Sequence, residues 1–110
     1  GEWEQSTTTG VRHLTAVQVG RTVRLTGTKD YAGTYLIGSD GRAVQKSFIR
    51  QDAQGNIHTT ENESEADQIS TIVAKVHGDV LRIDVTLDVR RPIGDLQVDI
   101  YRGFAEFKRL

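Results

Sequence analysis

The chain has 110 residues, a length that allows one domain with its own core. Its formal net charge of -1 and its sequence pI near 6.3 argue against a nucleic-acid partner. The absence of cysteine excludes a disulfide framework, a thiol nucleophile and a thiolate metal site. No apolar run approaches the roughly 20 residues of a membrane-spanning helix, so no membrane span is expected. Valine, isoleucine and threonine outnumber leucine and alanine, and 11 glycines are spread along the chain, which favours strands and turns.

Short alternating segments separated by turn residues predict an antiparallel meander in the first half of the chain. Gly20-Arg21 is a two-residue loop with glycine first, and Asp40-Gly41 is a second tight turn. Each is therefore expected to join two neighbouring strands. The strands predicted on this basis span residues 2–9, 11–19, 22–28, 32–37 and 42–51.

The second half continues the pattern after one interruption. Residues 61–67 carry four acidic side chains without apolar periodicity, which indicates a solvated loop or a single helical turn rather than a calcium site. Gly78-Asp79 predicts another hairpin, and Pro92 with Gly94 predicts the turn before the last strand. The strands expected in this half span residues 57–60, 69–77, 80–90 and 96–108.

The clearest strand is 80–90, where apolar and polar residues alternate strictly and predict one buried and one solvated face. A slip of one residue would bury carboxylates such as Asp84 at a cost of several kcal/mol. The residues expected to face inward are Leu81, Ile83, Val85, Leu87 and Val89.

All predicted connections are short, and no segment has the 3.6-residue period of a crossover helix. The predicted fold class is therefore all-β, a single antiparallel up-and-down β-barrel of about eight strands over residues 1–110. A two-sheet β-sandwich is the alternative, although sandwiches usually need connections that jump between sheets. Gly103 is expected to supply the bend or bulge that a long barrel strand requires.

Residue types that carry chemistry are few and scattered. His13, His58 and His77 lie on separate segments without the spacing of a metal site, so neither a metal nor another cofactor is expected. Neither a Gly-x-Ser-x-Gly nucleophile turn nor a glycine-rich phosphate loop is present in the sequence. Whether the chain is an enzyme stays open at this point.

The segment 69–77 is apolar on both faces, with Ile72 and Val73 adjacent. Only one of these faces can point into a single-layered barrel, so the other needs a cover. The candidates for this cover are the acidic loop, a terminal segment and another subunit. We therefore expect the chain to form a homo-oligomer.

Gly1-Glu2-Trp3, at the opening of the first strand, resembles the Gly-x-Trp motif of calycin barrels, the group of lipocalins, avidins and fatty-acid-binding proteins. The resemblance covers the whole chain in strand count and meander but only these residues in motif. It implies that Trp3 closes one end of the barrel. It also implies that a basic residue near the last strand, Arg102 or Arg109, packs over the indole ring.

An eight-stranded barrel is either filled by side chains or holds one small ligand. Because aromatic residues are few, the interior is expected to be under-filled and to bind a small apolar molecule. Pairing with the strand 80–90 places Val98, Ile100 and Arg102 inward, and Val17, Val23 and Leu25 are expected inward elsewhere. The ligand-binding residues predicted are Trp3, His13, Tyr35, Phe48 and Arg102.

Two other functions stay open. The barrel could be an isomerase or cyclase that folds an apolar substrate by shape and proximity. It could instead be a filled interaction domain that uses the outer face of 69–77. An open pocket would speak against the filled domain, and catalysis would further require buried ionisable groups in it, such as His13, Tyr31, Tyr35 or Arg102.

Overall fold

The computed structural model describes residues 1–91 and 100–110, and in this part of the chain the protein is all-β. Two single turns of 3-10 helix accompany the strands, η1 (Lys29–Tyr31) and η2 (Glu63–Glu65). The predicted turn at Pro92 and Gly94 and the start of the predicted strand 96–108 lie outside the described residues. The strands are β1 (Glu2–Thr7), β2 (Gly10–Val19), β3 (Thr22–Thr26), β4 (Gly33–Ile37), β5 (Ala43–Gln51), β6 (Ile57–Thr60), β7 (Gln68–His77), β8 (Val80–Val89) and β9 (Ile100–Arg109).

The chain forms two compact units that share four of the strands. We call the first the barrel unit; it comprises Gly1–Gln45, Ile72–Asp84 and Phe104–Leu110. The second unit comprises Lys46–Thr71 and Val85–Gly103. Strands β5, β7, β8 and β9 contribute residues to both units, whereas β1 to β4 belong to the barrel unit alone.

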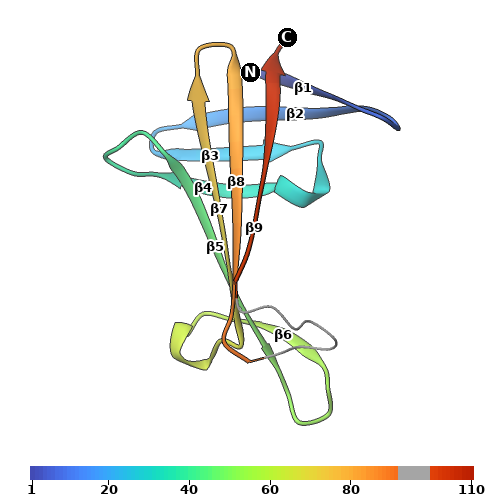
Figure 1. The fold of residues 1–110 in the computed structure, drawn as a ribbon. Helices are drawn as coiled ribbons and strands as arrows, with labels where there is room; N and C mark the ends of the chain where they lie inside the picture. Colours follow the sequence, from blue (N-terminus) through green and yellow to red (C-terminus); the bar gives the residue numbers. More distant parts are fainter. Residues whose placement is uncertain (92–99) are drawn as a thin grey trace. The chain divides into compact units, whose positions relative to one another are not determined.

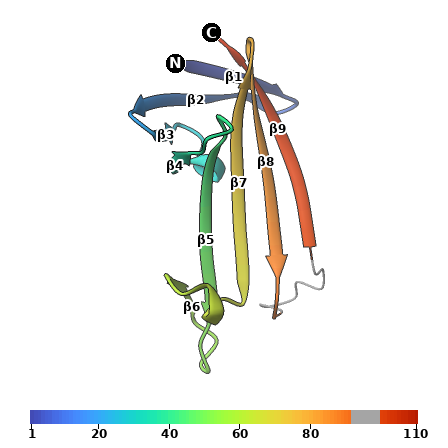
Figure 2. The same cartoon turned by 90° about the vertical axis from the view of Figure 1, so that its left-hand side faces the viewer.

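Eight strands form a closed antiparallel up-and-down barrel, which confirms the predicted fold class. Their order is β4-β3-β2-β1-β9-β8-β7-β5, and pairing of β4 with β5 closes the ring (Figure 1). Each of these strands contributes residues to the barrel unit. Figure 2 shows β5, β7, β8 and β9 running side by side, and β6 pairs with β5 outside the ring.

Tight turns hold the register between neighbouring strands. Gly20 and Gly78 have φ values of 61° and 59°, a region that glycine adopts without steric cost. The turn at Gly20 sets Val19 opposite Thr22 and Ala16 opposite Leu25. Both predicted Gly-first hairpins therefore connect antiparallel neighbours, β2 with β3 and β7 with β8.

The core of the barrel unit consists of alternate residues from its eight strands, as a single buried face requires. Antiparallel pairing joins several of these inward residues directly, among them Trp3 with Leu14. The buried apolar residues of this unit are Trp3, Leu14, Leu25, Tyr35, Ala43, Ile72, Ala74, Leu81, Ile83, Ala105 and Phe107.

Strand β8 follows its sequence pattern in part. Leu81, Ile83 and Val89 are buried, as predicted, and the Asp84 side chain is exposed. Two further residues expected inside, Val85 and Leu87, are only half-buried; both belong to the second unit.

The predicted inward face of β9 is wrong by one residue. Ile100 is 54% exposed and Arg102 is exposed, whereas Ala105 and Phe107 are buried. The odd-numbered residues face inward because Arg109 pairs with Trp3, which points into the barrel. This long-range pairing is not encoded in the local pattern of β9. Val98, which the same prediction placed inward, lies outside the described residues.

The predicted inward face of β2 is also wrong by one residue, because it too depends on pairing with other strands. Val17 is 55% exposed and His13 is exposed, while Leu14 is buried and Ala16 faces inward opposite Leu25. The inward face of β2 follows from its pairing with β1 and β3, which places Leu14 beside Trp3. The predicted inward positions of Val23 and Leu25 on β3 are confirmed, because both line the interior.

In the second unit, Asp67 connects several segments through hydrogen bonds. Its backbone N–H donates to the Ile49 carbonyl (2.8 Å), and its carboxylate accepts from the Gln51 N–H (2.6 Å). The same carboxylate pairs with Arg91, and its carbonyl accepts from the N–H groups of Arg90 and Arg91. The acidic segment 61–67 thus contains the predicted single helical turn, η2, but ends in a buried anchor rather than a solvated residue.

Candidate functional site

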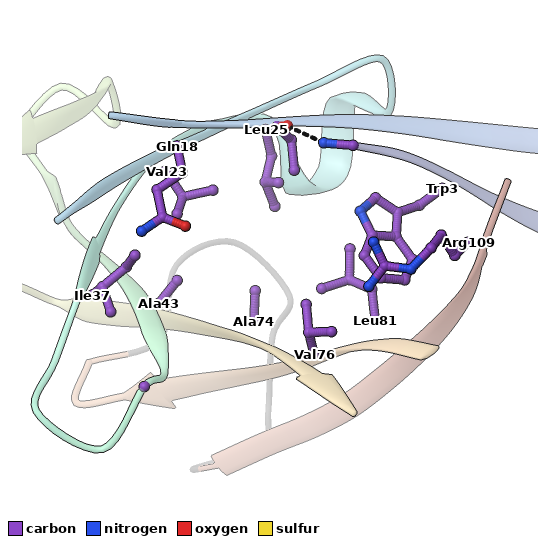
Figure 3. A pocket seen from close by; sticks show the side chains of 13 residues that line it. Trp3, Gln18, Val23, Leu25, Ile37, Ala43, Ala74, Val76, Leu81 and Arg109 are labelled. Carbon is purple, nitrogen blue, oxygen red and sulfur yellow. Dashed lines mark hydrogen bonds between the residues drawn. The ribbon is translucent and has the colours of Figure 1, made fainter. Parts of the chain in front are cut away.

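The barrel unit contains a pocket of about 400 Å³ (Figure 3). All eight barrel strands contribute to its wall or rim, and all lining residues belong to the barrel unit. The lining residues are Gly1, Trp3, Ala16, Gln18, Val23, Leu25, Ile37, Gly41, Ala43, Ala74, Val76, Leu81 and Arg109.

The pocket exists because small residues occupy inward positions on several neighbouring strands. Ala16 stands opposite Leu25, and Ala43 stands opposite Ile37. With Ala74 on β7, these three alanines leave space that larger side chains would fill. The other side chains of the wall are mainly aliphatic, so the greater part of the pocket surface is apolar.

Large side chains fill the interior next to the pocket. Tyr35 and Phe107 are fully buried at inward positions, two residues before Ile37 on β4 and two residues before Arg109 on β9. The Phe107 ring meets Tyr31 of η1 edge to face, with centroids 6.0 Å apart. The packed rings of Tyr35, Phe107 and Tyr31 close the interior beyond the inner end of the pocket. The exposed residues of the pocket lie at its opening.

Tyr35 is held in this filled region by its hydroxyl group. The hydroxyl donates to the Tyr31 carbonyl oxygen at 2.7 Å. Burial, and to a lesser degree the neighbouring Tyr31, raises the pKa of Tyr35 to about 12. Tyr35 is therefore a neutral structural group near neutral pH and does not line the pocket.

Three side chains bring polar groups to the pocket: Trp3, Gln18 and Arg109 (Figure 3). The Arg109 guanidinium carbon lies 4.5 Å from the Trp3 ring centroid, a cation–π contact. Arg109 Nη2 also donates to the Gly78 carbonyl at 3.2 Å. The Gln18 amide nitrogen donates to the Gly20 carbonyl at 3.0 Å.

The structure brings only part of the predicted site together. Trp3 lines the pocket, and Tyr35 lies inside the barrel but outside the pocket. His13 and Arg102 are exposed on β2 and β9, and Phe48 is a half-buried residue of the second unit. His13 and Arg102 lie outside the pocket because each stands on the outward face of its strand, opposite to the face predicted for it.

Arg109, rather than Arg102, packs over Trp3, in agreement with one of the two alternatives that the resemblance implies. Gln18 and the alanines of the wall were not predicted as site residues. A usable signal was present in the sequence, because Ala43 and Ala74 stand at inward positions in strands otherwise rich in larger residues. Recognising it requires the inward face of each strand to be known first.

The second unit contains a histidine–carboxylate pair. His58 Nε2 lies 2.7 Å from Asp52 Oδ2 in the β5–β6 hairpin. Hydrogen bonds from His58 and from the backbone of Asn56 and Gln54 lower the pKa of Asp52 to about 2. These contacts hold the hairpin loop, and no group of three metal-ligating side chains occurs among residues 1–91 and 100–110.

Comparison with protein-family models, with curated proteins and with solved structures found no match to the chain. Among the described residues, no helix has the length and apolar character needed to cross a membrane. The pocket geometry is therefore the main basis for a functional conclusion.

Proposed function

We propose that the barrel unit binds a small apolar molecule in the pocket next to Trp3. The observation that carries the proposal is the volume of about 400 Å³ behind a mainly aliphatic lining. Ligand pockets are typically about 300–1,000 Å³, with apolar walls and a few polar groups. The contact between Trp3 and Arg109 also agrees with the proposed likeness to calycin barrels.

Neither alternative function gains comparable support. A filled interaction domain would leave no pocket of this size in the barrel. Acid–base catalysis by an isomerase or cyclase would need ionisable groups beside its substrate, and the four residues expected to supply them, His13, Tyr31, Tyr35 and Arg102, do not line the pocket. Binding without turnover is thus the function that the geometry favours.

Titration with the uncharged dye N-phenyl-1-naphthylamine tests the proposal. The unmodified protein is expected to give saturable fluorescence enhancement. Ala74→Leu is expected to weaken dye binding roughly tenfold, because overpacking costs about 1–3 kcal/mol. The matched control, Thr34→Leu, adds a similar side chain at an exposed position of β4 outside the pocket.

Thr34→Leu is expected to bind the dye like the unmodified protein. Absence of saturable binding by the unmodified protein would refute the proposed function. Equal affinities of the unmodified protein and a folded Ala74→Leu variant would also refute it, because the dye would then bind elsewhere.

We also propose that the outer face of β7 is a contact between copies of this chain. Val73 is half-buried and lies between Ile72 and Ala74, which are buried on the inner side of the strand. Val73→Asp is expected to give a folded monomer, because the carboxylate would lose its hydration only in the complex. Sedimentation of the unmodified protein as a monomer at micromolar concentration would overturn this proposal.

A further inference from the structure

We propose that the open edge of β9 next to β1 binds an extended segment of a partner protein, which joins the sheet as an added strand and carries a basic side chain. This contact is separate from ligand binding, because the residues around the edge do not line the pocket. It is carried by a groove of about 520 Å³ in the barrel unit, where β1 and β9 separate.

Strands β1 and β9 pair over a short length. Trp3 and Glu4 of β1 have partners on β9, and among the described residues no later position of β1 has one. Beyond Glu4, β1 crosses the C-terminal end of β9 instead of running beside it (Figure 1). The groove opens at this point, with Ser6 on one side and Glu106 on the other.

The backbone of β9 presents unpaired groups to this groove. The Leu110 N–H donates to a β1 carbonyl oxygen at 3.0 Å, whereas the Arg109 N–H donates at 2.8 Å to a carbonyl oxygen of the turn before β8. Backbone groups of successive strand residues alternate in direction, so the even-numbered residues of β9 face β1. Phe104 and Glu106 therefore direct their N–H and C=O groups into the groove, where no described strand pairs with them. Such an edge is a template for another strand.

A second separation of strands, between β4 and β5, is closed by the chain itself. The Gln45 side-chain amide donates to the Thr34 carbonyl oxygen at 3.4 Å, and Gly33 leaves space for that amide. Among the described residues, no side chain forms a corresponding hydrogen bond with the backbone of Phe104 or Glu106. The groove between β1 and β9 is therefore open to a segment from outside the chain.

The charges along the groove favour a basic segment. Lys108 stands opposite Glu4, so their charges compensate each other. The Arg82 guanidinium, on the neighbouring strand β8, donates to both carboxylate oxygens of Asp84. Glu106 makes no ion pair with another described residue and leaves a negative charge in the groove. A lysine or arginine opposite Glu106 would compensate this charge.

Phe104 adds an apolar requirement to the charge. Its side chain is 62% exposed and lies two residues before Glu106, on the same face of β9. Aromatic pairs and pairs of opposite charge both stabilise neighbouring strands. An antiparallel segment therefore fits this edge when an aromatic residue follows its basic residue by two positions.

NMR titration of the isotope-labelled protein with the peptide acetyl-Thr-Thr-Lys-Thr-Phe-Thr-Thr-amide tests the proposal. Saturable shifts and slower exchange are expected at the amides of Phe104 and Glu106, which face the groove. The amides of Ala105 and Phe107 face β8 and are expected to change less. Replacing the peptide lysine by glutamate is expected to weaken binding roughly tenfold, because it places like charges opposite each other.

Two matched comparisons separate backbone pairing from charge. N-methylation of the peptide lysine and phenylalanine removes the N–H groups that face β9 and is expected to weaken binding at least about fivefold. N-methylation of the threonines that follow them removes N–H groups that face away, and this peptide is expected to bind like the unmodified one. Glu106→Lys is expected to reverse the preference for the lysine peptide over the glutamate peptide. Glu61→Lys, at an exposed position of the second unit, should leave this preference unchanged.

Absence of saturable shifts up to about 1 mM peptide would overturn the proposal. Equal binding of the two N-methylated peptides would overturn strand addition, and so would an unchanged preference in a Glu106→Lys variant with the circular dichroism of the unmodified protein. Protection of the Phe104 and Glu106 amides that rises with protein concentration, without peptide, would also contradict it, because a second copy would then occupy the edge. Dye binding tests the pocket separately from all of these measurements.

Discussion

Two phenylalanines of β9 provide a direct test of the face that this strand turns inward. Phe107 is 0% exposed and packs against Tyr31, whereas Phe104, three positions earlier, is 62% exposed. The Arg82 guanidinium carbon lies 4.3 Å from the centroid of the Phe104 ring. If even-numbered residues of β9 faced inward, these environments would be exchanged.

Phe107→Ala is expected to destabilise the protein by about 3–5 kcal/mol, the cost of replacing a buried phenylalanine and leaving a cavity. This value includes the edge-to-face contact with Tyr31, which contributes about 0.5–1.5 kcal/mol. A domain of this length loses roughly 4–5 °C in Tm per kcal/mol, so the Tm should fall by about 12–25 °C. Phe104→Ala removes an exposed cation–π contact of about 0.5–1 kcal/mol and should lower the Tm by less than about 5 °C.

Thermal unfolding followed by circular dichroism, with urea unfolding as a second measurement, compares the two variants. Both remove the same atoms from the same strand, so differences in residue type and strand propensity cancel. Equal destabilisation by the two substitutions, or a larger effect of Phe104→Ala, would refute the inward face of β9 and with it the position of Arg109 at the pocket.

Three other predictions concern hydrogen-bonded groups away from the pocket. Asp52 has its pKa lowered from 3.8 to about 2, chiefly by the hydrogen bond from His58. Its contribution to hairpin stability should therefore be present above pH 4 and lost as the pH falls toward 2. The loss should be seen as faster amide exchange in the hairpin, and an unchanged exchange rate across this range would contradict the assignment. Tyr35→Phe should cost about 0.5–1.5 kcal/mol by chemical denaturation. Because the pKa of Tyr35 is raised to about 12, the stability that Tyr35 contributes should be complete below pH 10 and lost as the pH rises toward 12. In a tyrosine absorbance titration, Tyr35→Phe should lack the latest phenolate step. Persistence of that step in the variant would be inconsistent with the raised pKa. Asp67→Ala leaves the Gln51 N–H without its acceptor and should destabilise the protein by about 1–3 kcal/mol; a change in urea midpoint within error of zero would argue against its anchoring role.

The sequence by itself determined the strands and turns, because their signals are local. Glycine at the start of the two-residue loops Gly20-Arg21 and Gly78-Asp79 permits a positive φ, which a tight hairpin needs. The alternation in 80–90 also predicted burial of Leu81 and Ile83. With short connections throughout, these signals were sufficient for an antiparallel meander of about eight barrel strands.

Only the tertiary structure decided which face of β2 and β9 points inward, and therefore which residues form the pocket. A strand has period 2, so a shift of one residue exchanges its faces. The face of β9 depends on the pairing of Arg109 with Trp3, two residues at opposite ends of the chain. The same closure of the ring brings Ala16, Ala43 and Ala74 from three strands around one space. Such a space depends on contacts between distant segments, which no local pattern along the chain can predict.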